Sequence, residues 1–198
     1  MTMRRVAVAL GAALALVVTA AGARAEESTL LGDLGDVDHG GYGGPTVRFT
    51  QIDGEFSVLS GGQGGWIINH RYVLGGGGFG LANPNRITAM DDDVLRSGKL
   101  EMGYGGGMIG VIVNSDGLIH AAVDLLIGAG GMTTQKHASD DVFFVLEPAA
   151  HAMLNVTDFF RFGVGASYRV VHGAGFGEVD DGDLDGLAWG FIFKFGSF

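Results

Sequence analysis

Histidines and carboxylates recur four residues apart in two apolar, alternating segments of the sequence. His120 precedes Asp124 in one segment, and Glu147 precedes His151 in the next. Residues separated by an even number share one face of a β-strand, so each pair points the same way. An imidazole beside a carboxylate can bind a metal ion or transfer protons. Ion pairs that only stabilise a fold use the same residues and are the more common case, so we favour a structural role.

Other charged residues alternate with apolar ones in the same manner. In 159–172, Arg161 and Arg169 lie on the face opposite to Phe160 and Phe162, and Lys194 lies between two phenylalanines near the C-terminus. An apolar face toward lipid and a polar face toward an interior are typical of a membrane barrel. We expect an internal charge network rather than a conducting path, because a small barrel has room for little more than side chains. The predicted network contains Arg48, Glu101, His120, Asp124, Glu147, His151, Arg161, Arg169 and Lys194.

The elements that carry these residues are short alternating segments bounded by turn signals. No apolar stretch after residue 25 is long enough to span a bilayer as a helix. The repeated period of two predicts an all-β fold, an eight-stranded antiparallel up-and-down transmembrane β-barrel. Its glycines, 37 in the chain, fall in mid-strand runs where missing side chains leave room for larger interior residues. The predicted strands are 46–52, 55–69, 72–82, 97–113, 118–131, 142–154, 159–172 and 184–198. In 46–82, where glycine blurs the alternation, the register stays open.

The connections between these strands differ in length from one end of the predicted barrel to the other. Outer-membrane barrels have short periplasmic turns and longer extracellular loops. The connections 69–71, 114–117 and 155–158 are short. Those at 83–96, 132–141 and 173–183 are long, while Asp53-Gly54 is a two-residue hairpin signal. An even number of strands places both barrel termini on the periplasmic side, where the last strand can pair with the first.

The N-terminal part of the chain predicts export. Residues 1–25 have a basic start, an apolar stretch and a small-x-small site ending at Ala25, as in a Sec signal peptide. Residues 26–43 are expected to form a flexible, Gly- and acid-rich periplasmic arm, and 44–198 the barrel. Removing 1–25 takes away three arginines and no acid, so the formal charge changes from −10 to −13. Nucleic acid is therefore not expected as a partner, and the absence of cysteine excludes disulfides and thiolate metal sites.

The final residues, WGFIFKFGSF, alternate aromatic side chains and end at Phe198. Together with the strand pattern, they resemble the small eight-stranded outer-membrane barrels of bacteria, similar in plan to OmpA, OmpX and OmpW. GGPTVRFTQIDGEF and GGWIINHRYVLGGGGFGL also resemble a family of outer-membrane proteins without an assigned activity. The resemblance implies that Phe198 is the signal read by the barrel-assembly machinery. Phe198 departs from the class pattern, because it is out of phase with Phe191, Phe193 and Phe195 unless a bulge intervenes.

The function expected from these features is a structural or surface-interaction role in the outer membrane of a Gram-negative bacterium. The acidic extracellular loops are the expected contact surface, and outer-membrane lipid and lipopolysaccharide are the expected partners. We expect a monomer with no catalysis and no cofactor. A narrow, porin-like channel for small solutes is one alternative, and a lipid-modifying outer-membrane enzyme is a second. A periplasmic barrel of the calycin kind is the rival fold, which requires apolar residues to point inward. The acidic loop residues are Asp91, Asp92, Asp93, Asp140, Asp141, Glu178, Asp180, Asp181, Asp183 and Asp185.

Overall fold

The computed structural model describes residues 38–52, 54–83, 86–91, 94–134, 137–176 and 179–198. The predicted signal peptide and nearly all of the predicted arm lie outside these residues. Within the described part of the chain, no helix is both long enough and apolar enough to cross a membrane.

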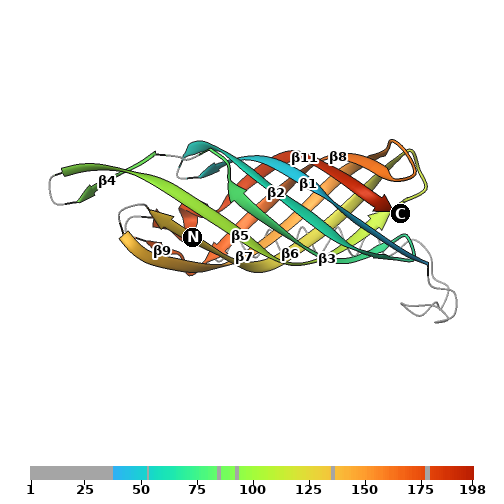
Figure 1. The fold of residues 1–198 in the computed structure, drawn as a ribbon, viewed down its shortest axis with the longest axis horizontal. Coiled ribbons are helices and arrows are strands. Elements are labelled where there is room, and N and C mark those ends of the chain that lie inside the picture. The colour runs from blue at the N-terminus through green and yellow to red at the C-terminus, as the bar shows by residue number, and fades with distance from the viewer. Residues whose placement is uncertain (1–37, 53, 84–85, 92–93, 135–136, 177–178) are drawn as a thin grey trace.

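The described residues form a closed antiparallel barrel. Eight strands follow one another around the ring in the order β3-β2-β1-β11-β8-β7-β6-β5, and pairing of β3 with β5 closes it. Figure 1 shows these strands tilted across the long axis of the barrel. Closure gives each of these eight strands two hydrogen-bonded neighbours, so the ring itself has no free edge. The predicted fold class is confirmed. The ring strands are β1 (His39–Ile52), β2 (Glu55–Ile68), β3 (Tyr72–Leu81), β5 (Val94–Val113), β6 (Ile119–Thr134), β7 (His137–Asn155), β8 (Phe160–His172) and β11 (Gly186–Ser197).

The two ends of the barrel differ, and we call them the turn end and the loop end. At the turn end, three short connections join β2 to β3, β5 to β6 and β7 to β8, as predicted. Asn69, His70 and Asn114 adopt positive φ angles of 51°, 53° and 60° there, which suits short turns. At the loop end, Gly54 joins β1 to β2 with a φ of 73°, which glycine adopts without strain.

The loop end contains more regular structure than the sequence predicts. β4 (Arg86–Asp91) pairs with the start of β5, so most of the predicted loop 83–96 is a hairpin that extends beyond the ring (Figure 1). β6 and β7 likewise continue into the predicted loop 132–141. Such hairpins satisfy their backbone hydrogen bonds internally, so they persist beyond the ring. The third loop contains β9 (Gly175–Phe176), β10 (Val179–Asp180) and a short helix, α2 (Asp181–Leu184).

The first strand begins earlier than predicted. β1 starts at His39 instead of residue 46, so residues 39–43 belong to the barrel and not to the arm. Gly41 pairs with Trp66 of β2 and with Ser197 of β11. Glycine has a low strand propensity, which hides the strand from a sequence pattern, whereas pairing on both sides holds it in place.

Alternation separates an apolar outer surface from a filled interior. Trp66, Leu74, Ile109 and Trp189 are among the large apolar side chains exposed on the outside. Inside, one apolar cluster around Phe143 and Leu184 fills the loop end, and a second around Tyr42 and Met153 fills the turn end. The charged residues lie among these clusters. The calycin-like alternative is not supported, because the outer face is itself apolar.

Inward-facing glycines make space for the polar side chains of the interior. A Cβ added to Gly110 would overlap the Asp124 carboxylate, and one added to Gly165 would overlap the His151 ring. These two positions on β5 and β8 therefore admit the residues that face them from β6 and β7. The predicted reason for mid-strand glycine holds at both sites.

Candidate functional site

Most of the predicted network residues are buried inside the barrel. Glu101 is the exception, and its prediction is wrong because its side chain is exposed. Met102 and Tyr104 are buried, so Glu101 has the outward parity of β5. The glycines that follow hide this parity in the sequence. The buried members of the predicted set are Arg48, His120, Asp124, Glu147, His151, Arg161, Arg169 and Lys194.

Glu147 lies at the centre of the first polar group, which we call the Glu147 cluster and which also contains Arg48, Tyr104 and Ser167. The Glu147 carboxylate forms an ion pair with the Arg48 guanidinium. The hydroxyl of Tyr104 donates to Oε2 at 2.7 Å, and that of Ser167 donates to Oε1 at 2.6 Å. Glu147 is 1% exposed, so a buried carboxylate receives donors from three other strands. This is the arrangement that a buried charge requires.

Aromatic rings and α2 complete the surroundings of this cluster. The Arg48 guanidinium carbon lies 3.7 Å from the centre of the Phe79 ring. Arg169 donates through Nε to the Leu184 carbonyl of α2 at 2.7 Å. Leu184 is fully buried in the apolar cluster of the loop end. α2 therefore caps the interior above the Glu147 cluster.

A second polar group lies nearer the turn end; this Asp124 cluster contains Tyr42, His120, Asp124, His151 and Lys194. Oδ2 of Asp124 and Nε2 of His151 are 3.3 Å apart, a close contact without the alignment of a hydrogen bond. The Lys194 ammonium lies 4.2 Å from the centre of the Tyr42 ring. Both Asp124 oxygens, both His151 nitrogens, His120 Nδ1 and the Tyr42 hydroxyl are buried without a hydrogen-bond partner among the described residues.

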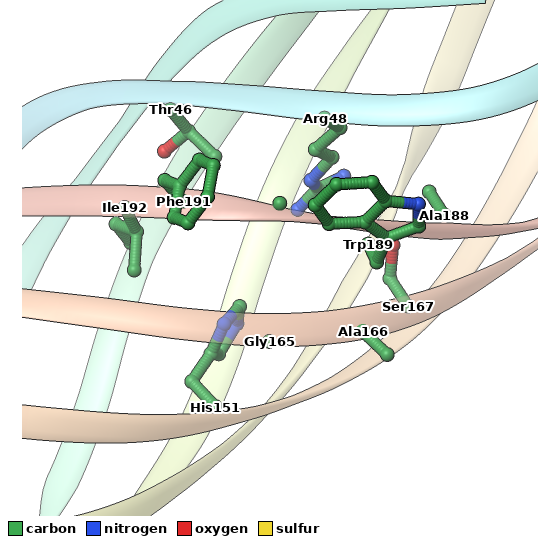
Figure 2. A pocket seen from close by; sticks show the side chains of 11 residues that line it. Thr46, Arg48, His151, Gly165, Ala166, Ser167, Ala188, Trp189, Phe191 and Ile192 are labelled. Atoms are coloured by element: carbon green, nitrogen blue, oxygen red, sulfur yellow. The ribbon is translucent and has the colours of Figure 1, made fainter.

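A small cavity lies between the two clusters. Its volume is about 10 Å³, close to the space that one water molecule occupies. Figure 2 shows Thr46 and Arg48 reaching it from β1, His151 from β7 and Ser167 from β8. Buried side chains of both clusters surround this cavity, as expected for the interior of a small barrel.

The structure pairs the carboxylates with other partners than the sequence spacing suggests. Asp124 contacts His151 across β6 and β7, while Glu147 contacts Arg48 from β1. Strand spacing gives the shared face correctly, but it does not identify the partner across the barrel. No group of three or more His, Cys, Asp or Glu in the described residues is placed to hold a metal ion.

Several interior polar residues were missed by the sequence analysis. Tyr104 donates to Glu147, Tyr42 belongs to the Asp124 cluster, and Gln63 and Thr46 also have buried polar atoms. These residues lie in or beside glycine runs, where alternation is weak. The signal that identifies them is even spacing from a neighbouring inward residue, as for Tyr42, Thr46 and Arg48 on β1.

The turn-end mouth of the barrel holds Arg161 and Phe198. The pairing of β11 with β8 and β1 is regular up to Phe195 and Ser197, so no bulge changes the phase of Phe198. Its ring therefore turns inward, where it stacks on Tyr42 and contacts the apolar cluster of the turn end. The Arg161 guanidinium carbon is 4.0 Å from the centre of the Phe198 ring.

A closed ring of eight antiparallel strands, an apolar outside and a filled, charged interior define the architecture of a small eight-stranded barrel. Among solved structures, the chain resembles Neisserial surface protein A (NspA) with a TM-score of 0.56 and 8% identity, over 82% of this chain and 99% of that one. It also matches Ail, the attachment invasion locus protein of Yersinia pestis, at a TM-score of 0.46 and 12% identity, over 80% and 97%. No family model and no curated protein matches. The predicted resemblance to the small outer-membrane barrels is confirmed for the fold.

Proposed function

We propose that this protein is an outer-membrane barrel of a Gram-negative bacterium whose loop end has a structural or surface-interaction role. The observation that carries the proposal is the apolar outer surface. Large side chains such as Trp66, Leu74, Ile109 and Trp189 are exposed there on several strands. Monomeric proteins in water rarely expose so extensive an apolar face, whereas lipid accommodates it.

The loop end is the part proposed to meet partners. It extends beyond the ring through β4 and β5 (Figure 1), and the sequence concentrates acids in its three long connections. Two of these acids stabilise the local fold. Asp181 accepts from the Ala174 amide at 2.8 Å, and Asp185 accepts from the Val171 amide at 2.7 Å. The proposal assigns the remaining acids to contacts with lipopolysaccharide through divalent cations.

Orientation, export and assembly belong to the same proposal. The turn end faces the periplasm, the signal peptide directs export, and the monomeric barrel is inserted by the assembly machinery through its C-terminal strand. The burial of His120 and His151 in the interior gives no support to a lipid-modifying enzyme, since lipid contacts the outer face.

The location is tested on an outer-membrane fraction run on an SDS gel with and without boiling. A closed barrel that resists detergent migrates faster when unboiled, and we expect this band in the outer-membrane fraction. Recovery of a periplasmic protein that shows no such shift contradicts the proposal.

The surface role is tested with the purified barrel in vesicles mixed with lipopolysaccharide, with calcium or with a chelator. We expect calcium-dependent association that is lost when Asp91, Asp92, Asp93, Asp140 and Asp141 are changed together to asparagine. Glu55→Gln at the same end is the matched control, because it removes an exposed acid outside these connections. If the five-site variant associates with lipopolysaccharide as strongly as the unchanged barrel does, the role proposed for the acidic loops is wrong.

A further inference from the structure

We infer that the turn-end mouth binds a carboxylate group, in the form of the free C-terminal end of a peptide. The site lies at the opposite end from the proposed surface role and is independent of it. A recess of about 320 Å³ opens there. It is lined by Asn155, Val156, Thr157, Asp158, Arg161 and Phe198.

Arg161 supplies the positive charge of the recess. Its side chain is about nine-tenths buried, at 9% exposure, and its guanidinium stacks on Phe198. Among the described residues, no carboxylate forms an ion pair with it. Lys194 lies directly opposite on β11, so two cations face each other across one pair of strands. Lys194 is also close enough to Asp124 to interact with it, so Arg161 is the cation with which an anion in the recess pairs.

Asn155 supplies an acceptor beside this charge. It lies directly opposite Arg161 across β7 and β8. Its Nδ2 donates to the carbonyls of Ser115 and Gly117 at 3.0 and 2.9 Å, which fixes the orientation of the amide. Oδ1 is buried and has no partner among the described residues. A ligand that fits therefore joins an anionic group to a hydrogen-bond donor, as a peptide end joins its carboxylate to the preceding N–H.

The acidic residues and the apolar lining of the recess limit the choice of ligand further. Asp158 lines the recess, and Asp116 is close enough to interact electrostatically with Arg161. These acids disfavour a doubly charged phosphate more than a singly charged carboxylate. Val156 and Phe198 offer an apolar surface to the side chain of the terminal residue. Arg161 can hold a carboxylate through two parallel N–H donors.

The test uses the full barrel in detergent micelles, labelled with 15N and titrated with N-acetyl-alanyl-leucine. We expect saturable shifts at the Asn155 side-chain amide and the backbone of 156–161. The C-terminal amide of the same peptide and inorganic phosphate should each bind about tenfold more weakly or worse, because the amide lacks the charge and phosphate meets the two acids. Equal binding of the amide, or tighter binding of phosphate, overturns the inference.

Variants then assign the binding to Arg161. Arg161→Gln should raise the dissociation constant of the peptide by about tenfold or more, since a charged hydrogen bond is lost. Arg71→Gln is the matched control, because Arg71 is an exposed cation at the same end but outside the recess. Heat-modifiability on SDS gels verifies that each variant is folded. A folded Arg161→Gln barrel that binds the peptide as the unchanged barrel does also overturns the inference.

Discussion

The Glu147 cluster and the Asp124 cluster are built from similar residue types in one interior, yet they satisfy their charges to different degrees. Glu147, at 1% exposure, accepts from Arg48, Tyr104 and Ser167. Asp124, at 4% exposure, has one contact with His151, and neither oxygen forms a hydrogen bond with a described residue. Burial alone therefore does not measure the contribution of an interior charge to stability. The number of aligned donors does.

The two carboxylates differ in their number of hydrogen bonds because their side chains lie at different positions in the interior. Glu147 extends from β7 to a level where donors from β1, β5 and β8 converge. Asp124 has a shorter side chain and lies against Gly110 of the adjacent strand. We expect the Glu147 cluster to fix the geometry of the interior and the Asp124 cluster to tolerate change.

The largest expected effect is that of Glu147→Gln. This substitution leaves Arg48 buried without its ion-pair partner, and breaking a buried pair costs about 3–5 kcal/mol. The free energy of unfolding in urea, measured in lipid or detergent, should fall by that amount. Replacing both members, Arg48→Met with Glu147→Met, should recover most of the loss. A loss below about 1 kcal/mol for the single variant contradicts the assigned role of the cluster.

Tyr104→Phe should have a smaller but distinct effect. The ring stays in place while the hydroxyl that donates to Glu147 Oε2 is removed. Loss of one hydrogen bond to a buried charge destabilises by about 1.5–3 kcal/mol. The same urea titration measures it, and Tyr72→Phe is the control on a neighbouring strand. Equal effects of the two substitutions would falsify the assignment of this hydrogen bond.

Asp124→Asn should destabilise by only about 1 kcal/mol, because a single misaligned contact is altered and a buried charge is removed. The informative quantity is the difference between the losses in the free energy of unfolding caused by Asp124→Asn and by Glu147→Gln under identical conditions. If Asp124→Asn costs as much as Glu147→Gln, the two clusters are equivalent and the contrast between them fails.

The smallest expected effect concerns conduction. The unchanged barrel should give no current above background in a planar bilayer, because the cavity between the clusters holds about 10 Å³. His151→Ala enlarges the space beside the Asp124 cluster, but the Glu147 cluster and buried Leu184 still close the loop end. We therefore expect no current from this variant either. Discrete current steps from the unchanged protein favour the channel alternative.

Much of the fold follows from the sequence, because strand alternation is a local property. Residues 142–172 and 184–198 alternate clearly, and β7, β8 and β11 include nearly all of the strands predicted there. The glycine runs of β3 and β5 carry no such signal, which explains the wrong face for Glu101 and the missed Tyr104. The start of β1 at His39 was hidden for the same reason.

The sequence by itself determined that the chain is a membrane-type barrel with an apolar outside and a charged inside, since parity along a strand needs no information from other strands. Only the tertiary structure decided which charges meet. Arg48 and Glu147 are 99 residues apart, and closure of the ring brings them together. It also decided that Phe198 turns inward onto Arg161, because the continuous register of β11 leaves no bulge to turn it outward.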